Sequence, residues 1–320
     1  MNNVLVVGAG AWGTALALQA HTAGRRVTLW ARDPARAAAL AQTRENPRLP
    51  GIAVPPEIAV TTTLQAADLV LLAVPMQHLR GIAARLPPGG PLLCCAKGIE
   101  AGTLALPLEV LDAAQPGRAA AILTGPNFAH EVAAGQPTAA VVAGDAEMLR
   151  GEILAALATP AFRLYGNDDP VGAQVGGAAK NVIAIAAGAV MGAGLGENAW
   201  AALVTRGLAE LGRLAASLGG RAETVSGLSG MGDLFLTCTS PVSRNFSFGV
   251  ALGQGVSVAD ILAGRSAVTE GVTTAPALVA RALRAGAAVP VCAAVAAVLS
   301  ERISLAQAIA ALLARPLRHE

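Results

Sequence analysis

The stretch "NVLVVGAGAWGTALALQAHTAG", residues 3–24, constrains the fold more than any other part of the chain. A short run of branched apolar residues leads into closely spaced glycines, and a helical pattern follows as far as Gly24. A strand, a glycine turn and a helix in this order open a sheet in which the helix carries the chain back to the start of a parallel strand. The N-terminal half should therefore be an α/β domain.

The rest of the first half repeats this alternation. Strand-like apolar runs stand within residues 25–33, 58–63, 68–75, 91–98, 120–128 and 138–144, with helices from about Gln77 and over 104–113. The pattern predicts a Rossmann-like, doubly wound parallel sheet with helices on both faces. After about residue 170 the chain has helical runs broken by glycines and no convincing strand. We expect an α/β domain over 1–170 and an all-α domain over 171–320.

The first glycine turn has the spacing GxGxxG, formed by Gly8, Gly10 and Gly13. In this context the first glycine makes a tight turn, the second lets a pyrophosphate approach the backbone, and the third lets helix and strand pack closely. The N-terminus of the following helix offers N–H groups and a positive dipole end to phosphates. The turn therefore predicts a dinucleotide cofactor.

The end of the second predicted strand, "LWARDP", bears on which dinucleotide binds. A site specific for NAD usually has a carboxylate here, for the ribose hydroxyl. In this chain Arg32 comes first and Asp33 second. A guanidinium suits a 2′-phosphate, so NADP should be accepted, and Asp33 leaves NAD open as well. An ordinary solvated strand end is the other interpretation of Arg32.

Polar residues follow two later strands. Lys97 comes after "CCA", and the turn Gly125 to Asn127 comes after "AAILT". In a doubly wound sheet the carboxyl ends of the strands line the crevice where ligands bind. Lys97 and the "GPN" turn are therefore expected at the reactive end of the cofactor, although Lys97 would also suit a plain surface position.

The helical half contains an unexpected charge. Lys180 stands in "GGAAKNVIAIAAG", and no other charged residue occurs between Val171 and Gly196. Burying an unpaired ammonium is costly, and a central lysine among many glycines argues against a membrane-spanning helix. Two interpretations remain: the side chain reaches water along the apolar face, or a desolvated lysine accepts a proton near neutral pH.

The stretch "GLSGMGDLFLTCTSPVSRNFSFG" carries the other candidates of this half. Asp233 is flanked by glycines, and Ser243, Arg244 and Asn245 follow together. With Lys180 they resemble a pocket for a phosphorylated alcohol. The lysine would take a hydroxyl proton, and the aspartate would orient the lysine or the hydroxyl groups. The arginine, with its neighbours, would hold the phosphate. As alternatives, Asp233 caps a helix and Arg244 forms a surface ion pair.

Composition excludes several classes of function. The net charge of +2 comes without a basic run, so we expect no nucleic-acid partner. No segment has the pattern of a signal peptide or a spanning helix, so no membrane insertion is expected. The four cysteines form no CxxC and the four histidines show no ligand spacing, which predicts neither a metal site nor a disulfide framework. A reducing, cytoplasmic location and a small-molecule substrate fit best.

Taken in order, the motifs resemble one family over essentially the whole chain. These are "GAGAWGTALA", "AKGIE", "GPNFAHE", "GGAAKNVIAIAAG", "TRGLAELGRL", "GLSGMGDLFLTCTS", "SRN" and "VTEGV". The chain is similar to bacterial-type NAD(P)-dependent glycerol-3-phosphate dehydrogenases. The resemblance implies reversible reduction of dihydroxyacetone phosphate to sn-glycerol 3-phosphate for glycerophospholipid synthesis, and a helical domain of the 6-phosphogluconate dehydrogenase type. It also leaves a homodimer open.

The family's functional residues carry over onto matching positions of this chain. The resemblance implies that Lys180 is the proton acceptor, with Lys97 and Asp233 as further catalytic residues. It places substrate contacts on Lys97, Gly125, Asn127, Lys180, Asp233, Ser243, Arg244 and Asn245. It places cofactor contacts on Gly8, Gly10, Ala11, Trp12, Gly13, Arg32, Lys97, Ala129, Arg244, Val268 and Glu270.

Two positions depart from the family's usual pattern. The family commonly has a hydroxyl residue at the position of Asn127 and often has serine at the position of Ala11. A contact through the main chain would survive either change, whereas a hydroxyl contact would not.

Two other functions stay open from the sequence. A related two-domain dehydrogenase of a 3-hydroxy acid or a sugar acid would also use a lysine in a "GGxxKN" setting. A cofactor-sensing module without turnover would need neither Lys180 nor Asp233.

Overall fold

The computed structural model describes residues 1–265 and 268–316. The chain divides into two compact units: Met1–Lys97 with Ala105–Gln174, and Gly98–Leu104 with Val175–Glu320. The last boundary between the units lies between Gln174 and Val175, and the predicted one lay between residues 170 and 171. The segment Gly98–Leu104 belongs to the second unit, although the prediction assigned it to the first.

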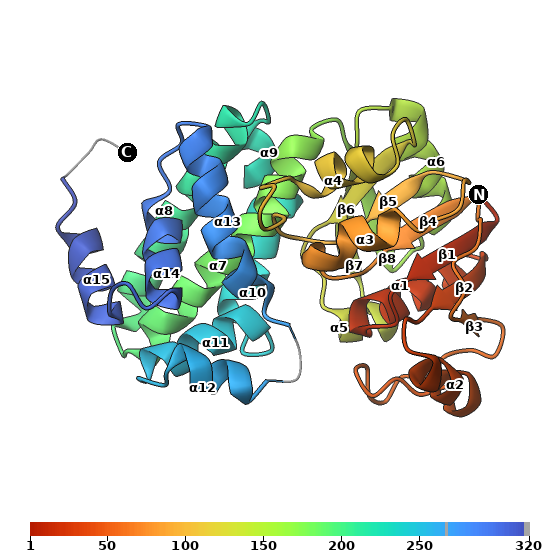
Figure 1. Ribbon diagram of the computed structural model, residues 1–320, viewed down its shortest axis with the longest axis horizontal. Helices are drawn as coiled ribbons and strands as arrows, with labels where there is room; N and C mark the ends of the chain where they lie inside the picture. The colour runs from red at the N-terminus through yellow and green to blue at the C-terminus, as the bar shows by residue number, and fades with distance from the viewer. Residues whose placement is uncertain (266–267, 317–320) are drawn as a thin grey trace. The chain divides into compact units, whose positions relative to one another are not determined.

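The first unit is built on one sheet (Figure 1). Its order is β3-β2-β1-β4-β5-β6-β7-β8, with the first strand of the chain inside the sheet. The strands are β1 Asn3–Val7, β2 Arg26–Trp30, β3 Ala59–Thr61, β4 Leu69–Leu72, β5 Leu92–Cys94, β6 Ala120–Thr124, β7 Thr138–Ala143 and β8 Phe162–Asn167. Crossing from β3 on one side of β1 to β4 on the other creates the point of reversed strand order at which such sheets bind ligands.

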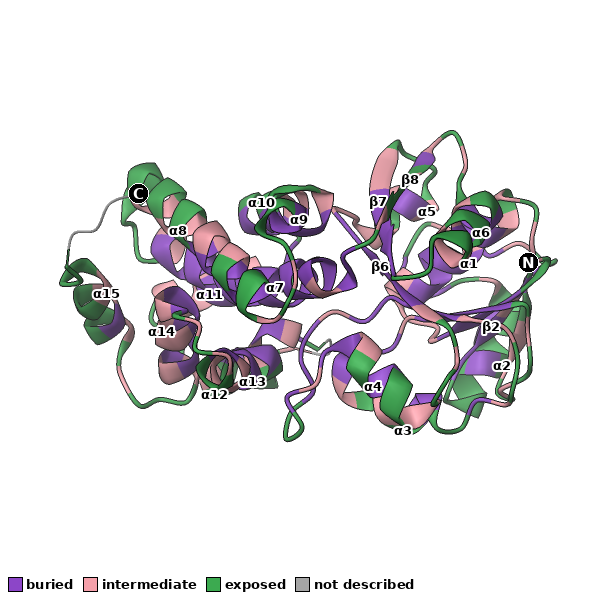
Figure 2. Ribbon diagram, turned by 90° about the horizontal axis from the view of Figure 1, so that it is seen from above, coloured by how far each residue is buried: buried purple, intermediate pink, exposed green. Residues whose placement is uncertain are grey.

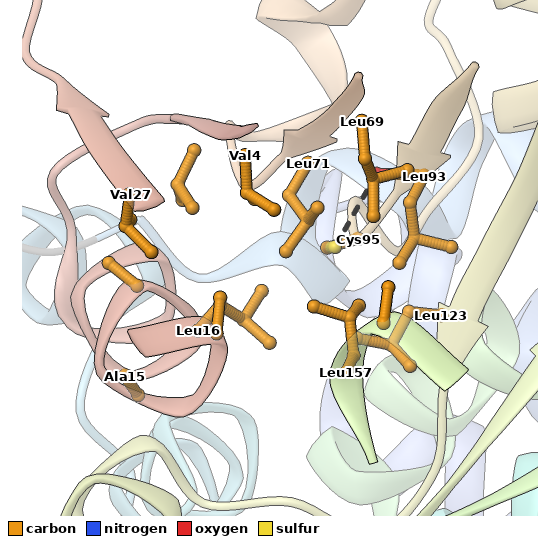
Figure 3. Packing of buried hydrophobic residues seen from close by; sticks show 14 of the residues in the cluster. Val4, Ala15, Leu16, Val27, Leu69, Leu71, Leu93, Cys95, Leu123 and Leu157 are labelled. Carbon is orange, nitrogen blue, oxygen red and sulfur yellow. Dashed lines mark hydrogen bonds between the residues drawn. The ribbon is translucent and has the colours of Figure 1, made fainter. Parts of the chain in front are cut away.

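Helices cover both faces of this sheet, as predicted. They are α1 Ala11–Thr22, α2 Pro34–Thr43, α3 Leu79–Ala83, α4 Pro107–Ala114, α5 Ala129–Ala133 and α6 Glu147–Leu157, with a 3-10 turn, η1, at Met76–His78. Strand side chains alternate between the faces, so β1 contributes Val4 and Val6 to one buried cluster and Leu5 and Val7 to the other. Figure 3 shows the first cluster, where strand leucines face Leu16 of α1.

Two features of the sheet differ from the prediction. Strand β7 runs antiparallel to β6, with Thr124 opposite Val141. The connection between them contains only the five-residue α5, about 7.5 Å of helix, which is too short to return the chain along a strand of about 17 Å. Strand β8 was not predicted, because as an edge strand with alternating exposure it has the mixed sequence "FRLYGN".

The second unit is helical, as predicted. Its elements are α7 Pro170–Gly192 (which begins in the first unit), α8 Gly196–Ser217, α9 Ala222–Ser226, the π-helical turn η2 Leu228–Gly232, α10 Asp233–Thr239, α11 Arg244–Gly253, α12 Val258–Ala263, α13 Glu270–Arg284, α14 Pro290–Leu299 and α15 Leu305–Leu313. Helix α7 begins where the Asp169 carboxylate accepts the N–H of Gly172 at 2.8 Å. Every residue from Gly172 to Val190 is buried, and α7 is the core of this unit (Figure 2).

Glycines let other helices pack directly on α7. A Cβ at Gly188 would lie 2.0 Å from the carbonyl oxygen of Phe246, and one at Gly192 would lie 2.2 Å from that of Val250. On α11, a Cβ at Gly249 would lie 2.0 Å from the carbonyl oxygen of Ile185. These glycines are needed because two helix backbones touch, and the contact holds α11 against the C-terminal half of α7.

Helix α7 has the length and composition of a membrane span. However, 78% of its most apolar 18-residue stretch is buried within the structure, as in the core helix of a globular domain.

The cysteines Cys94, Cys95, Cys238 and Cys292 are free and buried. Within the described part of the chain, no group of three or more His, Cys, Asp or Glu residues is arranged to hold a metal ion.

Candidate active site

The glycine turn at the start of α1 has the geometry that its spacing predicts. Gly8 has φ +116°, and a Cβ there would lie 2.5 Å from the carbonyl oxygen of Ala73. A Cβ at Gly13 would lie 1.8 Å from the carbonyl oxygen of Gly8. A Cβ at Gly10 would meet no protein atom within 4 Å. Packing therefore requires the first and third glycines, and the open space beside the second suits a diphosphate approaching the N-terminus of α1.

A residue that sequence reasoning missed holds this turn. Asn46, 3% exposed, donates its amide to the hydroxyl of Thr14 at 2.7 Å and to the carbonyl of Ala9 at 3.3 Å. Ala9 belongs to the glycine turn, and Thr14 lies in the first turns of α1. The sequence carries no signal for this contact, because Asn46 stands in a loop far from the turn along the chain.

The two charged residues after β2, Arg32 and Asp33, have different surroundings. Arg32 is exposed. Asp33 is the N-cap of α2, and its Oδ1 accepts the N–H groups of Ala35 at 2.9 Å and Arg36 at 3.3 Å. Pro34 follows at the first helical position, as is common. The carboxylate is therefore engaged by the helix, while the guanidinium lies at the surface.

The strand ends of the first unit bring Lys97 and the "GPN" turn together. Lys97, partly buried, donates its ammonium to the carbonyl oxygen of Gly125 at 3.1 Å. Asn127 turns its amide NH2 inward, to Thr138 at 2.8 Å and to the carbonyl of Ala139 at 2.9 Å. That amide braces the turn, so the side-chain nitrogen of Asn127 is already occupied. Ala129 is the first residue of α5, which starts directly after the turn.

In the second unit, Lys180 is buried and paired. It is 9% exposed, and Asp233 is 1% exposed. The Lys180 ammonium donates to Asp233 Oδ1 at 2.5 Å and to the Thr237 hydroxyl at 2.9 Å. The side chain therefore does not reach water along the helix, and the cost of burying the charge is offset by a carboxylate. Thr237, one turn after Asp233 on α10, was missed by sequence reasoning.

The thiol of Cys238 lies next to this pair. Burial raises the pKa of Cys238 to about 12, the nearby Lys180 lowers it and Asp233 raises it. The thiol is thus neutral under ordinary conditions, and the charges of this cluster are those of Lys180 and Asp233. A lysine beside a carboxylate inside a helical core can hold or release a proton.

The start of α11 carries the "SRN" residues. Ser243 is the N-cap, and its hydroxyl accepts the N–H of Phe246 at 3.2 Å. Asn245 is buried and donates to Asn181 Oδ1 at 2.8 Å, while its own Oδ1 accepts the N–H of Gly271 at 3.0 Å. Asn181 follows Lys180 directly, and sequence reasoning did not assign it a role. Through this pair of amides, Asn245 is tied to the helix that carries the lysine.

Arg244 is exposed at the first position of α11. Its guanidinium donates to the carbonyl of Val268 at 2.6 Å, and Arg265 donates to the carbonyl of Arg244 at 2.7 Å. Two guanidinium groups therefore lie near one helix N-terminus, which favours an anion. Val268 is exposed, and Glu270 is the first residue of α13.

Comparison with known proteins gives the family. The description "NAD-dependent glycerol-3-phosphate dehydrogenase N-terminus" matches residues 3–149, and that of the C-terminus matches residues 169–310. The chain belongs to the NAD-dependent glycerol-3-phosphate dehydrogenase family. It is 56% identical to glycerol-3-phosphate dehydrogenase [NAD(P)+] of Acidiphilium cryptum, covering 98% of this chain and 97% of that one.

Other members agree with this assignment. A Bradyrhizobium protein with the same name is 52% identical over 99% of this chain and 98% of its own length. The crystal structure of the Coxiella burnetii glycerol-3-phosphate dehydrogenase has a TM-score of 0.93 at 34% identity, over 98% of this chain and 99% of that one. Membership confirms the predicted family and its two-part architecture, a Rossmann-like domain followed by a helical domain.

Proposed function

We propose that this chain catalyses the reversible, NAD(P)H-dependent reduction of dihydroxyacetone phosphate to sn-glycerol 3-phosphate, with Lys180 as the proton donor and acceptor. The observation that carries the role of Lys180 is its burial at 9% exposure with the carboxylate of Asp233 at 2.5 Å. The names of the relatives at 52% and 56% identity support the reaction.

In the oxidative direction, the amine of Lys180 takes the proton of the C2 hydroxyl group while the C2–H bond electrons leave as hydride, so C2 becomes a carbonyl carbon. A bound nicotinamide supplies the hydride acceptor, and in the reverse direction the donor. In reduction, the ammonium of Lys180 returns the proton to the oxygen. Proton transfer by a positioned group is typically worth about 10²–10⁴-fold in rate. We assign Asp233 to hold the ammonium and Lys97 to polarise the reacting oxygen.

The choice of basic residue supports these roles. Of the 23 lysine and arginine residues, only Lys97 and Lys180 are lysines. Arginine stays protonated in proteins, whereas lysine can lose its proton when it is desolvated. A chain that otherwise uses arginine has lysine at the two positions where the proposed chemistry needs an ammonium that can exchange a proton or act as a compact charge.

The phosphate of the substrate is assigned to the start of α11. Arg244 offers a guanidinium fork, and Ser243 and Asn245 flank it at a helix N-terminus. Gly125 and Asn127 complete the assigned substrate contacts, Asn127 through its main chain or its Oδ1, because its amide NH2 is engaged within its own turn.

The residues of the first unit fit a dinucleotide. Gly8, Gly10 and Gly13 with Ala11 and Trp12 would hold the diphosphate, and Arg32 a 2′-phosphate. With Asp33 engaged as the cap of α2, we expect NADPH to bind better than NADH. Lys97, Ala129, Arg244, Val268 and Glu270 are assigned as further cofactor contacts. Supply of glycerophospholipid synthesis, a cytoplasmic location and a homodimer are parts of the same proposal.

The test is an assay of the purified protein with NADPH. Dihydroxyacetone phosphate should be reduced at a steady rate, and the oxo forms of 3-hydroxy acids and sugar acids should be poor substrates. Preference for a 3-hydroxy acid would favour the related two-domain dehydrogenase, and binding of NADPH without turnover would favour the sensing module.

The phosphate assignment has its own test. Arg244→Ala should lower kcat/KM for dihydroxyacetone phosphate by about two orders of magnitude, because a charged hydrogen-bonded contact is worth about 2–3 kcal/mol. Unphosphorylated dihydroxyacetone should be much less affected, since it does not use the anchor. Because the cofactor is the same in both assays, an equal loss for both substrates would mean that Arg244 does not bind the phosphate.

A further inference from the structure

The helix that carries Lys180 touches the segment before Asp233 through its backbone. A Cβ at Gly176 would lie 2.5 Å from the carbonyl oxygen of Ser229 and 2.9 Å from the Cα of Gly230. Gly176 and Lys180 are four residues apart on α7, so they lie on the same face one turn apart. One face of α7 thus makes two contacts in succession, with η2 through Gly176 and with α10 through Lys180.

The segment η2 is a π-helical turn that ends directly at Asp233. The N–H of Gly232 donates to the carbonyl of Gly227 at 3.1 Å, five residues back, as in a π-turn. The turn follows Gly227, whose backbone is extended, and runs without a break into α10, so Asp233 stands at the junction of the two. The direction of the Asp233 side chain therefore depends on this turn.

The turn is held from its other side as well. A Cβ at Gly230 would lie 2.0 Å from the carbonyl oxygen of Val225, at the end of α9. Both crowding atoms at Gly176 and at Gly230 belong to backbone, which cannot move aside as a side chain can. Any side chain at either position would push η2 away from its present place.

We propose that Gly176 and Gly230 are positioning residues for the reaction: they let the π-turn lie at the depth at which Asp233 reaches the ammonium of Lys180. This inference rests on the proposed role of Lys180. The glycines act through Asp233 and touch no reacting atom themselves. An alanine at either position should lengthen the contact of 2.5 Å between Asp233 Oδ1 and Lys180 Nζ.

A lengthened contact has a measurable chemical consequence. A carboxylate at hydrogen-bond distance favours the ammonium over the amine, by one or more pH units when the pair is close. The Lys180 ammonium donates to Asp233 and Thr237, and its charge acts on the nearby thiol of Cys238. Burial raises the pKa of that thiol to about 12, so it stays neutral through the neutral range.

The test uses the two lysines of the chain. Protein with ¹³C-labelled lysine gives one Cε signal from Lys97 and one from Lys180, assigned with Lys97→Arg. In Gly176→Ala and Gly230→Ala the titration midpoint of Lys180 should fall by about one pH unit or more. At pH values above both midpoints, the kcat/KM for oxidation of glycerol 3-phosphate should fall by about tenfold to a hundredfold because Lys180 is less well positioned. The rising limb of its pH profile should move to lower pH with the midpoint.

The matched control is Gly192→Ala. It creates the same kind of backbone contact on the same helix, 2.2 Å from the carbonyl of Val250, but three turns beyond Lys180. It should cost stability and leave the Lys180 midpoint unchanged. Unchanged midpoints in the first two variants, or an equal shift in the control, would overturn the inference. So would failure of both variants to fold when Gly192→Ala folds, since the glycines would then serve the fold alone. The proposed function fails separately, if Lys180→Arg keeps its activity.

Discussion

At the scale of single residues, the buried charges of Lys180 and Asp233 depend on each other. Each would be a buried charge without the other, and removing one partner from such a pair is destabilising by about 3–5 kcal/mol. From the sequence, Lys180→Ala should remove activity and leave stability nearly unchanged, because α7 is rich in alanine. The pairing with Asp233, which is 1% exposed, changes the second expectation.

We therefore expect Lys180→Ala to be inactive and also less stable by about 3 kcal/mol. The double variant Lys180→Ala/Asp233→Asn should recover much of that stability, since no carboxylate is then buried alone, and should stay inactive. Urea unfolding and kcat measure the two effects. A Lys180→Ala protein with more than about a tenth of the normal kcat would exclude the general-base role.

Arg32 should select between the two cofactors. Arg32→Ala removes a charge-assisted hydrogen bond to a 2′-phosphate, worth about 1.5–3 kcal/mol, so the dissociation constant of NADPH should rise about tenfold to a hundredfold. NADH binding should hardly change. Fluorescence titration with both reduced cofactors measures this. An equal loss of affinity for NADPH and NADH would mean that Arg32 does not bind the 2′-phosphate.

At the scale of elements, a buried carboxylate joins two helices of the second unit. Glu210 of α8, 1% exposed, accepts the N–H groups of Val291 at 2.6 Å and Cys292 at 3.2 Å. These N–H groups belong to the first turn of α14, whose N-cap residue Val289 has no side-chain acceptor. Glu210 thus caps a helix from a different element. Burial raises the pKa of Glu210, and the two backbone hydrogen bonds lower it by less.

The raised pKa fixes the sign of a pH effect. The folded protein binds the proton of Glu210 more tightly than the unfolded chain does, so this contribution to stability is complete below the ordinary carboxyl pKa. It is lost as the pH rises through the folded value. Glu210→Gln keeps an acceptor oxygen and does not titrate. Its stability relative to the natural protein should therefore improve as the pH rises from about 4 to 7. Urea unfolding at several pH values measures the difference, and a constant or declining difference would contradict the assignment.

At the scale of the whole molecule, the reactivity of the four cysteines can measure the unfolding of each unit. Cys94 and Cys95 lie in the first unit, and Cys238 and Cys292 lie in the second. Burial raises the pKa of all four thiols, to about 12 for Cys94 and Cys238. Since the thiolate is the reactive form, none should react with a thiol reagent in the native protein.

In rising urea, the two thiols of each unit should become reactive together, because a compact unit with its own core unfolds cooperatively. Pulse labelling followed by mass spectrometry of peptides measures the four rates separately. Rapid modification of any one cysteine without denaturant would contradict the burial on which this expectation rests.

The sequence alone determined those features that depend on near neighbours along the chain. The strand, the glycine turn and helix α1 follow from local sterics, and so does the change from alternating strands to helices in the second half. The family followed from ordered motifs, and the need for glycine at position 13 followed from its close approach to Gly8, five residues back.

Other features depend on residues far apart in the chain, and local sequence patterns could not predict them. From the sequence, the Lys180 side chain could either reach water or be buried. Its pairing with Asp233, 53 positions away, shows that it is buried. The order of the strands and the antiparallel pairing of β7 with β6 likewise join segments from different parts of the chain. The contacts of Gly176, Asn46 and Glu210 carry no spacing signal, because each partner lies far away along the chain and meets its residue only when the core closes.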